Sequence, residues 1–311
     1  MPALTEFHAQ RPQARVDWVV EESYAPLVRL HGAVSQVIPV NWRRWRQNLL
    51  DKGAWREIAS LRAQLRAGHY DAVIDAQGLI KSAIIAAMSA RPRYGLDWSS
   101  AREPIASLSY AHRVNASWDL HAVERCRRLF SAAGSYALSD QIAGPDYGLL
   151  LPGGSKASEY RCVLLHGTAQ ASKCWPEAHW RTIAVLLNAR GMQVILPHGS
   201  ADELARAERL AEGISGAQVA PRSAIDDMAR LLAGSALVIG LDTGLLHLAA
   251  ALRVPLVAIH VDSSPQATGP RGQGPIEVCG SIDQPPTPAD VLAAIDRLNS
   301  AIGDPSQRLV R

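Results

Sequence analysis

Short apolar runs alternate along the chain with longer amphipathic segments. Runs of four or five residues rich in β-branched side chains predict strands at 16–20, 37–40, 72–75, 162–165, 193–196, 236–240 and 256–259. Apolar residues that recur every three or four positions predict helices at 2–10, 55–67, 81–90, 121–133, 177–189, 201–212, 225–233, 245–252 and 288–302. This alternation predicts an α/β protein with parallel sheets and right-handed crossovers between strands.

The segment 144–160 is rich in Gly, Pro and Ser and is the best candidate for a linker. After it the alternation restarts with a strand, whereas the chain itself begins with a helix, so the strand that normally opens an α/β domain is missing from the pattern. A chain of 311 residues can hold two domains of ordinary size. We therefore expect an N-terminal Rossmann-like domain over 1–148 and a C-terminal one over 149–311, whose last helix is a candidate to pack back on the first domain.

The net charge and the cysteine content argue against some kinds of partner and site. The net charge of +3 and pI of about 8.7 are mildly basic, which argues against a nucleic-acid partner. The four cysteines include no Cys-x-x-Cys pair, and no spacing typical of metal ligands appears, so we expect reduced thiols, no metal and no cofactor. The longest apolar stretch, 245–261, is interrupted by charged residues and proline and is too short to span a bilayer.

The strongest candidate site lies in the segment 237–247, which reads LVIGLDTGLLH. A buried strand is followed by the small polar turn Asp242-Thr243-Gly244 and then by a helix that contains His247. This order places free backbone N–H groups and the positive end of a helix dipole at the carboxyl end of a parallel sheet, which predicts a phosphate or diphosphate site. The alternative is an ordinary strand–helix connection in which Asp242 is the N-cap.

Two other strand ends carry polar groups. Thr168 and Lys173 follow the strand at 162–165, where a mobile cation suits a diphosphate; the alternative is a surface loop with a solvated lysine. Glu203 follows the strand at 193–196, where a carboxylate can hold ribose hydroxyls. The alternative for Glu203 is a capping box with Ser200 as N-cap.

A basic cluster occupies 41–46, which reads NWRRWR. Guanidinium groups grip carboxylates and phosphates with two parallel hydrogen bonds, so Arg43 and Arg44 predict an anionic-ligand patch; the alternative is a solvated helix start. Lys81 and Arg102 are further basic groups near strand ends of the same domain.

Eight segments, taken together, resemble the heptosyltransferases of glycosyltransferase family 9, GT-B enzymes that build the inner core of lipopolysaccharide. They are DWVVEE at 17–22, RRWR at 43–46, YDAVIDAQGLIKSA at 70–83, GLDWSSAREPIASL at 95–108, HAVER at 121–125, KCWPEAHW at 173–180, RLAEG at 209–213 and DTGLLHLAAAL at 242–252. The segments run through nearly the whole chain in order, and those at 70–83 and 95–108 favour the first heptosyltransferase over the second. The resemblance implies a GT-B fold, in which two Rossmann-like domains face each other across a cleft.

The resemblance also implies a donor and its ligands. The donor would be ADP-L-glycero-β-D-manno-heptose, bound by the C-terminal domain. Thr168, Lys173 and the backbone of Thr243 and Gly244 would face the diphosphate, and Lys173 would stabilise the leaving group. Glu203 would hold the ribose, and Asp242 and His247 would complete the pocket.

The implied acceptor is Kdo2-lipid A, whose phosphates and carboxylates would meet Arg43, Arg44, Lys81 and Arg102. Transfer would invert the anomeric configuration. The protein would be cytoplasmic and peripheral on the inner membrane, with exposed tryptophans such as Trp42 and Trp45 helping it to sit on an anionic membrane surface.

The family begins with a strand and a loop that carries the expected general base, and this chain starts just after that segment. We therefore expect the base to lie upstream of Met1, absent from this chain; Asp75 is a candidate substitute. The alternatives to a heptosyltransferase I are a non-catalytic remnant that binds a nucleotide sugar or lipid A, and a heptosyltransferase II.

Overall fold

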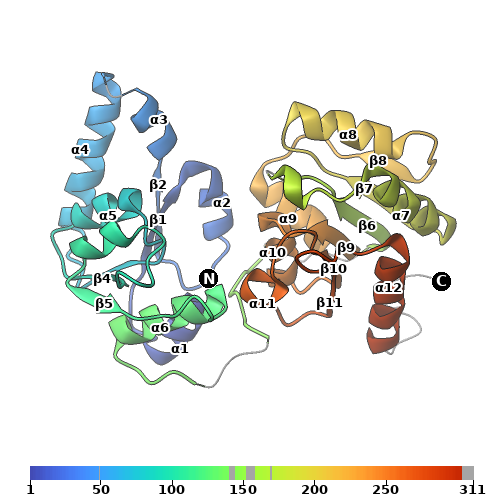
Figure 1. Ribbon diagram of the computed structural model, residues 1–311. Helices are drawn as coiled ribbons and strands as arrows, with labels where there is room; N and C mark the ends of the chain where they lie inside the picture. The colour runs from blue at the N-terminus through green and yellow to red at the C-terminus, as the bar shows by residue number, and fades with distance from the viewer. Residues whose placement is uncertain (49, 140–143, 152–157, 169, 303–311) are drawn as a thin grey trace. The chain divides into compact units, whose positions relative to one another are not determined.

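The computed structural model describes residues 1–48, 50–139, 144–151, 158–168 and 170–302. The chain divides into two compact units, Met1–Gln141 and Ile142–Arg311, which are described separately (Figure 1). The division falls shortly before the boundary expected after residue 148. Part of the expected linker, 152–157, lies outside the described residues.

The first unit begins with a helix, as the pattern predicts, and contains two parallel sheets. One sheet pairs β1 (Asp17–Glu21) with β2 (Gln36–Val40), and the other has the order β3 (Val73–Asp75), β4 (Arg93–Leu96) and β5 (His112–Val114). The two orders correspond to the 3-2 and 4-5-6 parts of a doubly wound sheet. No strand within the described residues joins them.

The helices of the first unit follow the strands in alternation. They are α1 (Pro2–Gln10), η1 (Glu22–Tyr24), α2 (Ala25–Val28), α3 (Trp42–Gln47), α4 (Lys52–Ala67), α5 (Ile80–Ala87), η2 (Pro104–Ser109) and α6 (Ala122–Gly134). Helix α1 packs on α6, where the buried guanidinium of Arg127 bonds both Glu6 and Glu124 at 2.6 Å. A buried charge needs such paired hydrogen bonds, so this contact fixes α1 on α6.

The second unit contains one parallel sheet of order β11-β10-β9-β6-β7-β8. Its strands are β6 (Ser158–Leu165), β7 (Gln193–Leu196), β8 (Ala217–Val219), β9 (Ser235–Leu241), β10 (Leu256–Ile259) and β11 (Ile276–Cys279). In chain order this is the doubly wound arrangement, and the winding reverses between β6 and β9. That reversal is where sheets of this type bind ligands.

Helices cover both faces of this sheet. They are η3 (Ala171–Lys173), α7 (Glu177–Ala189), α8 (Ala201–Ala211), α9 (Ile225–Ala233), α10 (Gly244–Ala251), α11 (Pro265–Thr268) and α12 (Pro288–Ile302). Side chains alternate along the strands, so Leu237 and Ile239 of β9 join the core under α7, α8 and α12. Helices α9 and α10 pack on β9 as well (Figure 1).

The last helix, α12, packs on β10, β11 and α7. Its buried residues Val291, Ile295 and Leu298 belong to the core of the second unit. Its apolar face is therefore used within its own unit. The packing of this helix on the first domain stays a prediction. No helix among the described residues is long and apolar enough to cross a membrane.

Candidate functional site

The candidate site lies where β6 and β9 end side by side. These strands pair in parallel, with Leu165 opposite Gly240 at their carboxyl ends. The chain leaves β6 into the loop 166–168 and leaves β9 into the turn at Asp242 and Thr243. Because β6 and β9 flank the switch point of the sheet, the two loops diverge there and leave room for a ligand.

The turn after β9 leads directly into α10. Thr243 is the N-cap of this helix and makes no side-chain capping bond, so the prediction of Asp242 as N-cap is wrong. Gly244 is exposed, and a Cβ built on it would have no atom within 4 Å. The first turn of α10 therefore borders open space at Gly244, and a phosphate site at a helix N-terminus requires such space.

Lys173, Asp242 and His247 form a charged cluster at this turn. The Nζ of Lys173 lies 2.9 Å from Oδ2 of Asp242, and Nε2 of His247 lies 3.5 Å from Oδ1. Burial opposes ionisation of Asp242, but hydrogen bonds from His247, Lys173 and Ser263 outweigh it and hold the pKa of this carboxyl far below its usual value. The side chain of Lys173 is only 23% exposed, so the alternative of a solvated surface lysine is wrong.

Lys173 is held in place by the aromatic residue that follows it. Trp175 is fully buried, its indole N–H donates to the backbone oxygen of Pro286 at 2.8 Å, and its ring meets Trp180 edge-on at 5.1 Å. Pro176 then forms the N-cap of α7. The short helix η3 therefore has an anchor directly after Lys173, which restricts where the ammonium group can lie.

The structure adds two residues that the sequence analysis did not single out. His260 follows β10, and its Nδ1 lies 2.8 Å from Oγ of Ser263, which also bonds Asp242. Both residues are buried, and burial lowers the pKa of His260. The signal was available, because His260 stands at a strand end as Asp242 does.

Glu203 has the capping role that was the alternative to a ribose contact. Its contact with a ribose stays a prediction. Ser200 is the N-cap of α8 and accepts from the N–H of Glu203 at 3.2 Å, while Oε2 of Glu203 accepts from the N–H of Gly199 at 2.6 Å. This is a capping box in which the Glu203 carboxylate accepts from the N–H of the residue before the N-cap rather than from that of the N-cap itself. A Cβ on Gly167 would lie 2.4 Å from Oε1 of Glu203, so the carboxylate also covers the loop after β6 beside Thr168.

The basic cluster at 41–46 folds into a helix, α3, with Asn41 as N-cap. A helix start was the alternative to an anionic-ligand patch. Arg44 is bonded to Glu57 of α4, whereas Arg43 is exposed and has no ion-pair partner among the described residues. Trp45 is buried and donates to Glu57 at 2.8 Å, so the expectation that Trp45 is exposed toward a membrane is wrong.

Lys81 and Arg102 lie on two segments that pair through their backbones. The N–H of Glu103 donates to the oxygen of Gly78 at 2.9 Å, and the N–H of Ile80 donates to the Glu103 carboxylate at 2.6 Å. The structure thus brings Lys81 and Arg102 to neighbouring positions at the start of α5.

Asp75, the candidate substitute base, is buried at the end of β3. Its carboxylate accepts from the backbone N–H groups of Gln77 and Gly78 and from the hydroxyl of Tyr110 at 2.7 Å. These bonds give Asp75 a structural role in the turn that leads to α5.

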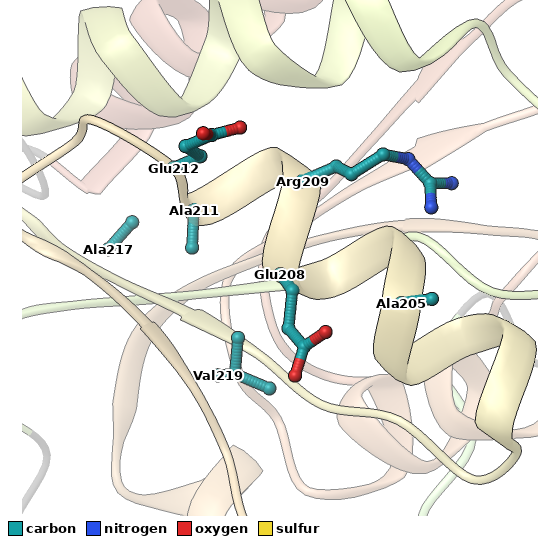
Figure 2. A pocket seen from close by; sticks show the side chains of 7 residues that line it. All are labelled: Ala205, Glu208, Arg209, Ala211, Glu212, Ala217 and Val219. Carbon is teal, nitrogen blue, oxygen red and sulfur yellow. The ribbon is translucent and has the colours of Figure 1, made fainter.

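The second unit also has a surface hollow that lies away from the turn at Asp242. Figure 2 shows it between the later turns of α8 and the edge strand β8. Its lining residues are Ala205, Glu208, Arg209, Ala211, Glu212, Ala217 and Val219. None of the expected donor ligands lines it, and Arg209 is paired with Glu177, so we do not assign it the ligand.

The fold and the site together define a class of protein. It is an α/β protein in which the switch point of a doubly wound sheet carries an open helix N-terminus, a partly buried lysine and an ionised carboxylate. Residues 58–289 match the model of glycosyltransferase family 9 (heptosyltransferase), and the chain belongs to this family.

Similar proteins agree with this assignment. The chain is 44% identical to lipopolysaccharide heptosyltransferase 1 of Pseudomonas aeruginosa over 285 residues, which cover 89% of this chain and 79% of the relative. Its structure is similar to that of E. coli heptosyltransferase WaaC with ADP, at 37% identity and a TM-score of 0.86, covering 96% of this chain and 94% of that one. Its structure is also similar to that of E. coli heptosyltransferase WaaC with ADP-2-deoxy-2-fluoro heptose, at 37% identity and a TM-score of 0.80, covering 97% of this chain and 94% of that one. The predicted fold class, α/β of the GT-B type, is confirmed.

Proposed function

We propose that this protein is a lipopolysaccharide heptosyltransferase I, which transfers heptose from ADP-heptose to Kdo2-lipid A. The observation that carries the proposal is the cluster of Lys173 and Asp242 at the switch point of the second sheet, in a member of this family. The relative from P. aeruginosa is a lipopolysaccharide heptosyltransferase 1, and WaaC binds ADP and an ADP-heptose analogue.

The donor's ADP binds at the loops after β6, β7 and β9. The backbone of Thr243 and Gly244 and the side chain of Thr168 face the diphosphate, and Lys173 lies beside it. Glu203, held over the β6 loop, accepts from the ribose hydroxyls. Asp242 and His247 face the sugar side of the pocket.

The chemistry follows from the charges at this turn. A hydroxyl of the acceptor attacks the anomeric carbon of the heptose and gives up its proton to a base or to water. The bond from that carbon to the diphosphate oxygen breaks, and ADP leaves with inversion. Negative charge grows on the departing diphosphate. Lys173, which Asp242 holds in place, and the N-terminus of α10 stabilise this charge without large reorganisation.

The acceptor binds the first unit through Arg43, Arg44, Lys81 and Arg102. These cations match the phosphates and carboxylates of Kdo2-lipid A. Because this acceptor is a membrane lipid, the protein works on the cytoplasmic face of the inner membrane as a peripheral protein at an anionic surface.

The direct test is an assay of ADP release and of product mass with the whole chain. ADP-heptose and detergent-dispersed Kdo2-lipid A should give ADP and an acceptor heavier by one heptose. UDP- and GDP-sugars are the donor controls, and an acceptor that already carries one heptose tests for heptosyltransferase II activity.

Each outcome of this assay has a definite meaning. Transfer to the unmodified acceptor alone supports heptosyltransferase I, and transfer only to the heptosylated acceptor contradicts it. ADP binding without any transfer would identify a nucleotide-sugar-binding protein and overturn the proposed activity.

A further inference from the structure

Helix α5 and the short helix η2 form one packed pair in the first unit. Ala83 of α5 and Ala106 of η2 belong to the same small buried cluster as Tyr110. The hydrogen bond from the N–H of Ile80 to Glu103 joins the start of α5 to the residue before η2. We call the outer side of this pair the α5–η2 surface.

Four large aliphatic side chains on the α5–η2 surface are exposed. On α5, Ile80 and Ile84 are 42% and 47% exposed and stand one turn apart, so they share one face. On η2, Ile105 and Leu108 are 60% and 63% exposed, and their spacing of three residues stacks them in one row of a 3₁₀-helix. Apolar side chains gathered on one surface mark an interaction site more than scattered ones do.

Basic groups lie at both ends of the α5–η2 pair. Lys81 and Arg102 stand at the start of the pair. The guanidinium groups of Arg93 and Arg113 donate to the backbone oxygens of Ser109 at 2.6 Å and Ser107 at 3.0 Å, at the end of η2.

The acidic group in this pair of helices, Glu103, accepts from a backbone N–H and is thereby held against the protein. The α5–η2 surface is thus apolar with a rim of positive charge.

We propose that the α5–η2 surface docks on an anionic phospholipid bilayer. Aliphatic side chains beside cations fit the boundary between acyl chains and anionic headgroups, where apolar burial and electrostatic attraction add. The surface also carries Lys81 and Arg102, so docking would bring these acceptor-binding residues to the membrane; this link rests on the proposed function. The surface replaces Trp45, which is buried, as the membrane contact.

The first test needs neither donor nor acceptor. The whole chain is sedimented with vesicles of phosphatidylcholine alone and with vesicles that contain phosphatidylglycerol. We expect binding to the anionic vesicles that weakens with salt. The double variant Ile84→Gln/Leu108→Gln should bind these vesicles more weakly, by about tenfold for each side chain that inserts.

The matched control replaces exposed aliphatic residues elsewhere, in the double variant Leu50→Gln/Val185→Gln. This control should bind as the unchanged chain does. Thermal melting of both variants checks that the folds are intact, and Ile105→Gln serves as a second variant of the surface. Absence of binding to anionic vesicles, or equal binding by the surface variant and the control, would overturn the proposal.

A second arm separates this inference from the proposed function. Heptose transfer is measured with the acceptor dispersed in detergent and with the acceptor embedded in anionic vesicles. The surface variant should keep its activity in detergent and lose most of it on vesicles. If the unchanged chain transfers no heptose in detergent, the proposed function fails, while the vesicle-binding result still decides the docking surface.

Discussion

The pair of Lys173 and Asp242 concentrates charge at one point of the second unit. Asp242 is 8% exposed and stays ionised because Lys173, His247 and Ser263 bond it. The carboxylate in turn orients the lysine, so the ammonium group is fixed at the end of β9 before any ligand arrives. A charge that needs no reorganisation is the kind that stabilises a leaving diphosphate effectively.

Replacement of Lys173 by alanine should therefore reduce catalysis more than binding. We expect Lys173→Ala to lower kcat by about 10²–10³-fold, because one preorganised electrostatic group at the developing charge is lost. Steady-state ADP release with both substrates measures this. Lys52→Ala, at the exposed start of α4, is the matched control and should leave kcat unchanged. A kcat within threefold of the parent would contradict the role of Lys173.

The buried His166 should make stability depend on pH. Burial lowers its pKa from 6.5 to about 4 in the folded protein, so the unfolded chain binds a proton at a higher pH than the folded one does. The stability is complete above pH 6.5 and is lost as pH falls toward 4. Between pH 7 and pH 5 the free energy of unfolding should fall by about 2 kcal/mol through this group.

Urea unfolding at several pH values measures this dependence. His166→Gln should have a flatter profile than the parent over the same pH range, because glutamine does not titrate. The lowered pKa of His260 acts in the same direction, so a residual slope is expected. Identical slopes for parent and variant would show that His166 is not the group responsible.

The positions of single residues could be predicted where a residue directly follows a strand. Asp242 and Lys173 follow strands, and parallel strands bring their carboxyl ends to one edge, so their meeting could be foreseen. The partner of Trp45 could not, because it is a residue from a different element, Glu57 of α4. Local pattern carries no information on such contacts.

At the level of elements, η3 depends on an anchor outside itself. Trp175 fills a buried site and reaches the oxygen of Pro286, before α12. Trp175→Phe keeps most of the packing and loses this hydrogen bond, so we expect it to lower the free energy of unfolding by about 1–3 kcal/mol. It should also lower kcat, because Lys173 loses its fixed position.

Denaturant unfolding and ADP release measure the two effects of Trp175→Phe. Trp55→Phe, at an exposed position of α4, is the control for a change of indole to phenyl. If Trp175→Phe loses stability but keeps the kcat of the parent, the anchor does not position the lysine.

The strands that the sequence did not reveal are short, and three of them, β5, β8 and β11, are edge strands. β4, β5, β8 and β11 have three or four residues each, and RYGL, HRV and AQV contain few apolar side chains. Such segments become strands through pairing with a neighbour, because tertiary contacts outweigh local preference there. By contrast, β9 is buried at every position and was evident from its composition.

Some helix ends could also be predicted from the sequence, and others could not. The predicted helix 55–67 begins earlier, at Lys52, because Asp51 caps it by accepting from the N–H groups of Gly53 and Ala54. That signal could be read from the sequence. The predicted helix 81–90 ends earlier, at Ala87. Ala90 has a φ of +58°, a left-handed conformation that alanine rarely adopts, so the sequence did not predict it.

At the level of the whole molecule, the two units differ in how their sheets are organised. The second has one doubly wound sheet with a switch point, and the first has two smaller parallel sheets. The alternation of strands and helices was enough to predict two α/β domains. Strand order was not, because it depends on which neighbours pair. In the proposed function, the nucleotide binds the second unit alone, at the loops after β6, β7 and β9.

Amide hydrogen exchange of the whole chain, with and without ADP, tests this assignment most directly. A ligand present at 100 times its Kd stabilises its binding state by about 2.7 kcal/mol, enough to slow exchange measurably. We predict that saturating ADP slows exchange in the segments 166–168 and 242–247 and leaves the first unit unchanged. Protection confined to the first unit, or to the hollow between α8 and β8, would contradict the account.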